Sequence, residues 1–155
     1  MSTQELVGEL DRAEVQYELV WHRKTSTAAE EAAALFVPRE QVAKTLVLAT
    51  RAGYVRAVVP ASARIDLSKA GKVLGGDETT RLATEQELAE AFPMFELGAV
   101  PPFGGGPGDR TIVDVHLTGQ DSVLVEAGSH SASLKIGTKD LLSLADAELA
   151  DLCEE

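Results

Sequence analysis

Apolar and polar positions alternate with two different periods along this chain, and each period predicts a different kind of element. Apolar residues three or four positions apart are typical of a helix with one buried face, whereas strict alternation is typical of a half-buried strand. Helices are predicted over residues 2–14, 28–35, 65–75, 84–92, 138–144 and 146–152, with a short helical turn from Pro38 towards Val42. Strands are predicted over residues 16–22, 42–50, 54–60, 80–83, 111–117, 122–127 and 133–136.

Residues that cap helices support several of these boundaries. Thr27 with Glu30, and Thr84 with Glu87, have the three-residue spacing of a capping box, in which side chains and backbone amides bond reciprocally. The last two helices are expected to have their N-caps at Thr138 and Asp146.

Two turns predict hairpins, and the hairpins predict the fold class. Residues 51–53 join the strands 42–50 and 54–60, and residues 118–120 join the strands 111–117 and 122–127. Hairpins interleaved with helices favour an α/β fold of the α+β type, with a mixed, largely antiparallel central sheet surrounded by helices. The length of 155 residues fits one compact domain over residues 1–155. No Gly-x-Gly-x-x-Gly follows the first strand, so dinucleotide binding is not supported.

Composition favours a cytoplasmic protein without a membrane partner. No apolar run approaches the roughly 20 residues that cross a bilayer, and the N-terminus lacks the pattern of a signal peptide. The single cysteine, Cys153, can form neither an internal disulfide nor a cysteine-rich metal site.

The charge is acidic overall but unevenly distributed. A net charge of −11 argues against general binding of nucleic acid, since affinity for phosphates is largely cationic. Residues 39–81 nevertheless hold eight basic and four acidic side chains. This basic sector suits a short, defined stretch of nucleic acid, although scattered solvated side chains would give the same count.

Lys44 is the first candidate for chemistry, because it interrupts an apolar run over residues 42–48. By alternation it shares a face with Val42, Leu46 and Leu48. An ammonium group on an apolar face needs a partner or a wet pocket with a ligand. The alternative is a side chain that reaches water from the start of the strand.

The histidines and one stiff loop supply further candidates. His22, His116 and His130 lack metal-ligand spacing, so no metal site is predicted. His130 lies in a Gly-Ser-His loop at residues 128–130, where it faces either a cleft or solvent. Residues 98–104 combine two prolines with flanking glycines, which makes either a rigid wall of exposed amides suited to an oxyanion or a plain surface loop.

Four stretches together resemble the YbaK / prolyl-tRNA synthetase-associated domain family of aminoacyl-tRNA deacylases. They occur in the family's order and span residues 15–145, nearly the whole chain. The stretches are residues 17–33 with His22, residues 42–48 with Lys44, residues 95–104 with Gly98, and residues 126–130 with the Gly-Ser-His loop.

This resemblance implies a compact α/β domain that hydrolyses the ester between an amino acid and the tRNA 3′ end, with no metal or cofactor. It implies that Lys44 holds the terminal adenosine or the aminoacyl group, and that the backbone of Gly98 contacts the substrate carbonyl. Gly128, Ser129 and His130 correspond to loop residues that face the substrate. Water or a substrate hydroxyl would attack, with His130 assisting.

The same resemblance implies the remaining contacts and partners. His22, Thr45 and Pro101 are expected to line the substrate site, and Thr45 follows the lysine as it does in the Cys-tRNA deacylase branch. The expected partners are the acceptor end of an aminoacyl-tRNA and, as a further candidate, an aminoacyl-tRNA synthetase. We expect a monomer or a weak homodimer, and the edited amino acid stays open.

Two other functions remain open from the sequence. A non-catalytic module that binds tRNA or a synthetase would keep the pocket and the basic sector without turnover. A hydrolase of small acyl esters or amides would fit the overall acidity and would not require tRNA.

Overall fold

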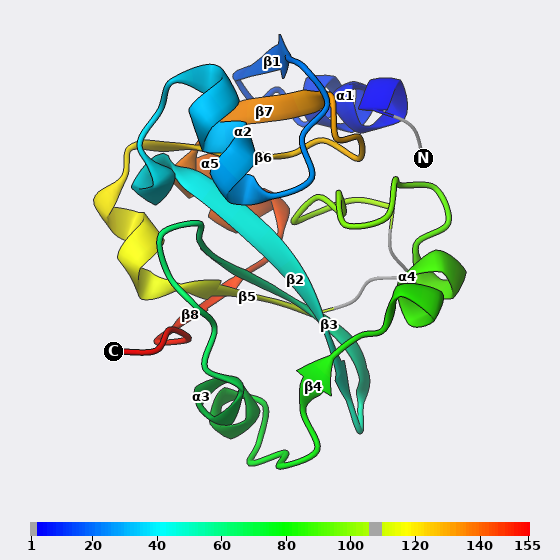
Figure 1. Cartoon of the computed structure of the whole chain (residues 1–155), viewed down its shortest axis with the longest axis vertical. Coiled ribbons are helices and arrows are strands. Elements are labelled where there is room, and N and C mark those ends of the chain that lie inside the picture. The colour runs from blue at the N-terminus through cyan, green and yellow to red at the C-terminus, as the bar shows by residue number, and fades with distance from the viewer. Residues whose placement is uncertain (1–2, 106–109) are drawn as a thin grey trace.

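The computed structural model describes residues 3–105 and 110–155, and the elements in these ranges follow the two periods of the sequence (Figure 1). The helices are α1 (Thr3–Arg12), α2 (Ala28–Leu35), α3 (Leu67–Val73), α4 (Glu85–Ala91) and α5 (Thr138–Leu144), with 3-10 turns η1 (Arg39–Gln41) and η2 (Val115–Gly119). The strands are β1 (Tyr17–Trp21), β2 (Val42–Thr50), β3 (Gly53–Pro60), β4 (Arg81–Leu82), β5 (Arg110–Asp114), β6 (Ser122–Glu126), β7 (Ala132–Gly137) and β8 (Glu148–Ala150).

Within the described ranges, all eight strands belong to one mixed sheet. Its order is β1-β7-β6-β2-β3-β5-β8, and β4 pairs with β2 beside this path. Four pairings are antiparallel, and three, β2 with β6, β3 with β5, and β5 with β8, are parallel. The α/β fold with a mixed sheet is confirmed, as is the hairpin of β2 and β3.

The second predicted hairpin is wrong. β5 pairs in parallel with β3, whereas β6 pairs with β2 and β7. The predicted strand over residues 111–117 ends at Asp114, whose carboxylate accepts the backbone N–H of His116 and so caps η2. The 3-10 turn carries the chain across to a distant position in the sheet.

The helix predicted over residues 146–152 is also wrong, because this segment contains β8. Asp146 has a positive φ of 46°, which ends the helical path after α5. The following residues add a parallel strand to β5, from Ile112 opposite Glu148 to Asp114 opposite Ala150. Pairing with β5 satisfies the backbone hydrogen-bonding groups of both segments, and this outweighs a weak helical pattern.

The predicted caps hold in part. Thr84 and Glu87 form a complete capping box at α4. Thr27 accepts the N–H of Glu30 as predicted, but the Glu30 carboxylate bonds to the N–H of Ser26. The cap predicted at Thr138 is wrong, because Gly137 is the N-cap and the Thr138 hydroxyl donates to the Gln120 carbonyl instead.

Helices and loops cover both faces of the sheet, as alternation along β2 makes clear. Val42 packs with Ala32 of α2, and Leu48 packs with Ala70 of α3. On the other face Ala43 joins the core beneath α1, while Val47 packs against Phe95. Among the described residues, no helix has the length and apolar character needed to cross a membrane.

Candidate functional site

The centre of the sheet opens into a fork between β2 and β6. These parallel strands pair only at Val42 with Leu124 and at Ala43 with Val125, although both strands continue in the same direction beyond these pairs. Lys44 and Glu126 are the next residues on the two sides. By alternation, both lie on the face of Val42 and Leu124, which is the face that α2 covers.

Lys44 is half-buried, and its ammonium group is anchored on one side of this fork. Its Nζ donates to the carbonyl of Ala63, in the segment after β3, at 2.8 Å. Burial lowers the pKa of Lys44, and the nearby Arg64 lowers it further. An ammonium has three N–H donors, and among the described residues only the Ala63 carbonyl accepts one, so donors remain for a ligand.

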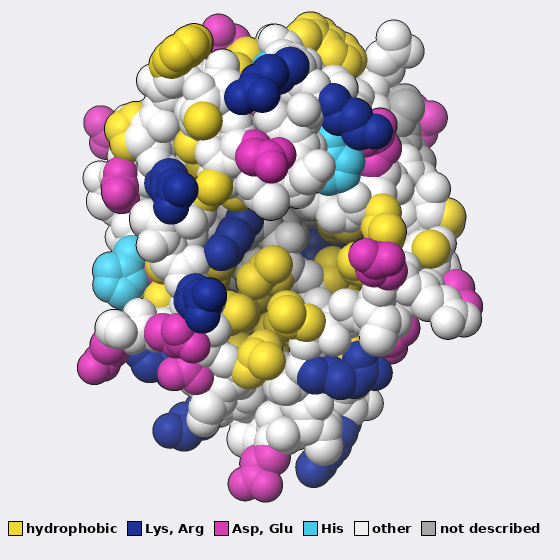
Figure 2. All heavy atoms as spheres, in the orientation of Figure 1, with side chains coloured by type: hydrophobic (Ala, Val, Ile, Leu, Met, Phe, Trp, Pro, Cys, Tyr) yellow, Lys and Arg dark blue, Asp and Glu magenta, His cyan; other side chains and the backbone are white. Residues whose placement is uncertain are grey.

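Figure 2 shows this face of the molecule from the side of α2. The surface is hollowed near its centre, with basic and apolar side chains at the rim of the hollow. A hollow bordered in this way admits a ligand that is partly anionic and partly apolar.

Thr45 does not lie beside Lys44, because successive side chains of a strand point to opposite faces. Its hydroxyl is buried and has no hydrogen-bond partner among the described residues. Thr45 shares its face of β2 with Val47, which packs against Phe95. A substrate contact for Thr45 therefore has to come from the side of the 92–105 segment.

The loops around Gly98 and His130 hold each other through direct hydrogen bonds. The N–H of Glu96 donates to the Gly128 carbonyl at 2.9 Å, and the N–H of Gly128 donates to the Ala99 carbonyl at 3.1 Å. The Glu96 carboxylate accepts the backbone N–H of His130 at 3.0 Å. The two loops thus form one unit, and they bring Gly98, Gly128, Ser129 and His130 together.

His130 is held in one orientation by the Leu97 carbonyl, which lies 2.6 Å from its Nε2. A carbonyl can only accept, so Nε2 carries the proton and neutral Nδ1 keeps a lone pair. Nδ1 is buried and has no partner among the described residues. The Nδ1 of His130 is therefore a buried acceptor whose lone pair is unused among the described residues.

Gly98 has a left-handed backbone conformation. Its φ of +82° favours glycine, and an added Cβ would lie 3.5 Å from Cε1 of His130. Within the described residues, the Gly98 N–H makes no backbone hydrogen bond, whereas the Gly128 N–H is occupied. Of the two amides, Gly98 is the one free to contact a carbonyl.

Pro101 lies in a buried segment that Arg56 of β3 holds in place. The Arg56 guanidinium donates to the carbonyls of Pro101 and Gly104, each at 2.7 Å, and lies 4.9 Å from the centre of the Phe92 ring. Arg56 is only 2% exposed. The proline-rich stretch is thus a rigid wall, although Pro101 itself is buried within it.

His22 belongs to a hydrogen-bonded chain that the sequence did not predict. Its Nδ1 lies 2.6 Å from the Arg23 carbonyl, and its Nε2 lies 2.9 Å from the Ser133 hydroxyl. Ser133 in turn bonds to the fully buried carboxylate of Glu31, from α2. Both ring nitrogens of His22 thus have hydrogen-bond partners within the protein, and His22 is linked to Glu31 through Ser133.

The Ser133 hydroxyl donates to Oε2 of the buried Glu31 carboxylate. Burial raises the pKa of Glu31, while the Ser133 hydrogen bond opposes this.

Glu126, the last residue of β6, is the acid on the β6 side of the fork. It pairs across strands with Ser133 and is 8% exposed. Burial, with the negative charges of Glu31 and Glu96 nearby, raises the pKa of Glu126 to about 8. No described residue donates a hydrogen bond to its carboxylate or forms an ion pair with it.

Fewer basic side chains of residues 39–81 are available to a ligand than the count of eight in the sequence suggests. Arg56 is buried, and three others face acids: Arg51 with Asp77, Lys69 with Asp151, and Arg81 with Glu87. Of the eight, those left without an ion pair in the described part of the chain are Arg39, Lys44, Arg64 and Lys72. Of these, Lys44 lies at the fork, and Arg64 is close enough to influence it electrostatically.

One group of potential metal ligands occurs among the described residues. Ligand atoms of Asp114, His116 and Cys153 lie within 4.8 Å of one another. Asp114 already accepts from Nδ1 of His116 and from the N–H of Leu152, so hydrogen bonds account for the arrangement. The sequence could not indicate this group, because Cys153 lies far from Asp114 and His116 along the chain and is brought close only by the fold.

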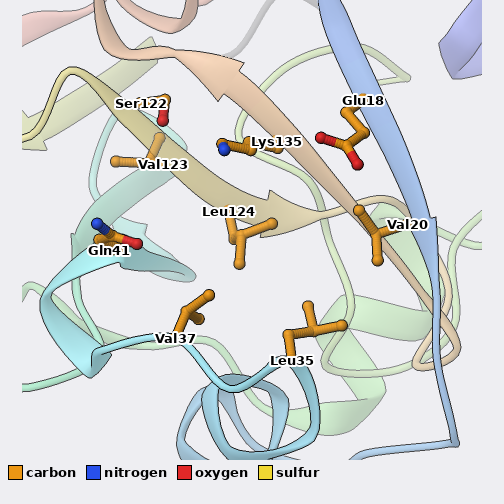
Figure 3. Close-up of a pocket in the computed structure, with 9 residues that line it drawn as sticks. All are labelled: Glu18, Val20, Leu35, Val37, Gln41, Ser122, Val123, Leu124 and Lys135. Carbon is orange, nitrogen blue, oxygen red and sulfur yellow. The ribbon is translucent and has the colours of Figure 1, made fainter.

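A separate pocket lies on the outer part of the same face, between the sheet and the residues that follow α2 (Figure 3). Its volume is about 230 Å³, and Leu35, Val37 and Leu124 form much of its apolar lining. Lys44 and the Gly98 and His130 loops do not line it. It is therefore distinct from the fork.

The sequence missed Glu31, Glu126 and Ser133. The alternation of side chains along β6 gives the one indication of Glu126. It places Ser122, Leu124 and Glu126 on one face of the strand, which α2 covers. An acid at an inward position of a strand predicts a polar site. Glu31 has no such indication, since it follows Glu30 in a helix rich in alanine.

Comparison with known proteins identifies a family that matches most of the chain. Residues 22–144 match the family described as the aminoacyl-tRNA editing domain. A protein of Enterococcus faecalis with the provisional name Cys-tRNA(Pro)/Cys-tRNA(Cys) deacylase EbsC is 25% identical over 138 residues, which are 88% of this chain and 83% of that protein.

Two further proteins are similar to this chain. A proline–tRNA ligase of Thermosipho africanus is 34% identical over 92 residues, which are 58% of this chain but only 16% of the ligase. A crystal structure described provisionally as a trans-editing enzyme for prolyl-tRNA synthetase superimposes with a TM-score of 0.87 and 30% identity, over 99% of this chain and 97% of the other.

Proposed function

This chain belongs to the aminoacyl-tRNA editing domain family, and from that premise we propose that it is a trans-editing deacylase that hydrolyses the ester of mischarged tRNA. The observation that carries the proposal is the half-buried Lys44 ammonium at the fork, with donors left for a ligand. The joined loops of Gly98 and His130 supply the second side of the site.

Lys44 suits the tRNA end of the substrate. The 3′ terminus of tRNA presents ribose oxygens and a phosphate, and an ammonium binds both as a compact positive charge. The unpaired Arg64 nearby adds a second cation for the adjacent phosphate. This part of the site binds the terminal adenosine and orients the ester.

The Gly98 amide suits the ester carbonyl. Water attacks the carbonyl carbon, and negative charge develops on the carbonyl oxygen before the bond to the ribose oxygen breaks. A fixed N–H donor stabilises that charge more than the ground state. The proton lost by the attacking water ends on the leaving ribose oxygen, so the products are a free amino acid and intact tRNA.

His130 has the tautomer needed to assist the attack. With Nε2 donating to Leu97, Nδ1 is the nitrogen that can accept a proton from water. An aminoacyl ester is already activated, so positioning supplies much of the acceleration. No step in this scheme requires a metal or an organic cofactor.

The partners follow from the substrate. An aminoacyl-tRNA in the cytoplasm is the substrate we propose, bound by a monomer or a weak homodimer of this chain. An aminoacyl-tRNA synthetase is a second candidate partner, since a segment of a proline–tRNA ligase resembles this chain. Thr45, Pro101 and Ser129 are proposed to shape the pocket for the amino acid.

Single-turnover deacylation of a panel of mischarged tRNAs tests this function. Lys44→Ala is expected to slow the reaction on the order of 10²-fold, as removal of one key donor does in other enzymes. Lys72→Ala, which removes an exposed lysine of α3, is the control and is expected to match the wild type.

Two outcomes contradict the proposal. Equal rates for wild type and Lys44→Ala would remove Lys44 from the active site. Tight binding of tRNA by the wild type without any turnover would favour the non-catalytic binding module instead.

A further inference from the structure

Glu126 is a buried acid with no role in the scheme above. It is the last residue of β6, lies two residues before Gly128, and is 8% exposed. Buried carboxylates are normally paired, since an unpaired buried charge is costly. Within the described residues nothing donates to this one, so its oxygens remain available to a ligand.

The charges around Glu126 favour a cation. Glu31 of α2 and Glu96 of the Gly98 loop are the charged groups that act on it, and both are acids. Lys44, on the opposite side of the fork, donates to Ala63 instead. A positive group that enters between these acids gains attraction from each of them.

Glu31 provides a second, independent indication of a missing donor. Its Oε2 bonds to Ser133, but its Oε1 is buried and has no partner among the described residues. An unsatisfied buried acceptor of this kind is rare in folded proteins. A ligand with several N–H donors would satisfy more than one of these acceptors at once.

The substrate class proposed above always carries such a group. Every aminoacyl ester has an amino group on the carbon next to its carbonyl, whatever its side chain is. Fixing that ammonium fixes the carbonyl as well, and the loop with the free Gly98 amide is bonded to Gly128, two residues after Glu126.

We infer that Glu126 binds the α-ammonium group of the aminoacyl ester, and that the site thereby selects free aminoacyl-tRNA over tRNA whose amino acid is N-acylated. This inference rests on the proposed deacylase function. Its consequence is that peptidyl-tRNA, which has an amide in place of the ammonium, is protected from hydrolysis.

The protonation of Glu126 is consistent with this role. With a pKa of about 8, the carboxyl group holds a proton at neutral pH while the site is empty. An arriving ammonium favours the ionised form and displaces that proton. The buried acid is therefore tolerated in the free protein and becomes charged when its ligand supplies the balancing charge.

The test compares each mischarged tRNA with its N-acetylated form in single-turnover hydrolysis. The wild type is expected to prefer the free form. A hydrogen bond to a charged group is worth about 1.5–3 kcal/mol, roughly 10- to 150-fold in rate. Glu126→Gln is expected to lose that much on the free form only, so the ratio between the two forms falls towards one.

Two controls accompany this variant. Glutamine has the shape of the protonated acid, so the fold should persist, and a thermal melt checks this. Glu18→Gln removes an exposed acid from β1, where it lies opposite Lys135, and should leave the ratio unchanged.

The outcomes separate this inference from the proposed function. If Glu126→Gln slows both forms equally, Glu126 is structural and the inference is wrong. If the wild type hydrolyses both forms at the same rate, the inference also fails while the deacylase function stands. If the wild type hydrolyses neither form of any tRNA, the proposed function itself fails.

Discussion

Gly128 and Gly53 share a left-handed backbone, with φ of +88° and +114°, but differ in their surroundings. An added Cβ at Gly128 would lie 2.8 Å from Cδ1 of Phe95, whereas at Gly53 nothing lies within 4 Å. Gly53→Ala is expected to cost about 1 kcal/mol from backbone strain. Gly128→Ala is expected to cost about 2–4 kcal/mol, because strain and overlap add.

Urea unfolding of both variants measures this difference. Equal losses of unfolding free energy would mean that Phe95 moves aside freely, and that Gly128 is needed for its backbone alone. A larger loss for Gly128→Ala would show that the packing of the Gly98 and His130 loops requires a residue without a side chain at position 128.

Glu126 also makes stability depend on pH. Its pKa of about 8 in the folded protein exceeds the ordinary value near 4.3, so the folded state retains a proton that the unfolded chain has lost. This group therefore stabilises the fold fully below about pH 4, and the contribution is lost as pH rises towards 8. Glu126→Gln is expected to gain several degrees in Tm over the wild type at pH 9 but little at pH 4.

Melting curves of the two proteins from pH 4 to pH 9 provide the measurement. Glu31 is present in both and responds alike, so only the difference between the curves is informative. Curves that stay parallel over this range would show that the Glu126 carboxyl is already ionised at neutral pH in the folded protein.

Individual residues were predictable where a single strand pattern was broken. Lys44 could be identified because it is a cation within an apolar run. Glu126 ends a strand, where a polar residue is ordinary, and Glu31 follows another acid in a helix, so each is a weaker signal than Lys44. Their proximity depends on packing α2 over β6 and β7, which no local period encodes.

At the scale of elements, the hydrogen bonds from Arg56 of β3 to the 101–104 segment can be tested directly. Arg56→Met removes two charge-assisted hydrogen bonds and leaves the Pro101 and Gly104 carbonyls without their donor. The expected loss is about 2–4 kcal/mol of unfolding free energy. Arg110→Met, which breaks an exposed ion pair with Glu148, is the control, with an expected loss below about 1 kcal/mol.

Chemical denaturation of the two arginine variants decides this point. A similar small loss in both would mean that the Phe92 stacking and the surrounding core hold the segment without Arg56. The deacylation rate of Arg56→Met is expected to fall as well, since the segment continues directly from the Gly98 loop.

Elements with a strong period and a clear cap were predicted with the right type. β2, α2 and α5 have the predicted bounds. The errors fall where long-range pairing decides the outcome: β8 forms because β5 offers an edge, and β5 leaves β6 because Asp114 caps a turn. Such partners lie more than 30 residues away in the chain, beyond the reach of periodicity.

For the molecule as a whole, the charge predicts weak and local binding of tRNA. With a net charge of −11 and few unpaired basic side chains near the fork, only a few phosphates should be neutralised. Arg64→Ala is expected to reduce the slope of log affinity against log salt by about one. Arg51→Ala should leave the slope unchanged, because Arg51 is exposed but faces Asp77.

Salt titration of tRNA binding by the three proteins tests this expectation. Identical slopes for Arg64→Ala and wild type would show that tRNA approaches from another side. A steep slope in the wild type would show that many more phosphates are contacted than the unpaired side chains allow.

The two-residue junction of β2 and β6 has a consequence for how such a protein can change. Val42, Ala43, Leu124 and Val125 set the separation of the half-sheets, and all four are apolar and buried. A bulkier or smaller side chain there is expected to widen or narrow the gap between β2 and β6 without altering the polar groups proposed to contact the substrate. Under the proposed function, amino acids of different size could then be admitted by repacking a hydrophobic joint, while the hydrolytic groups stay the same.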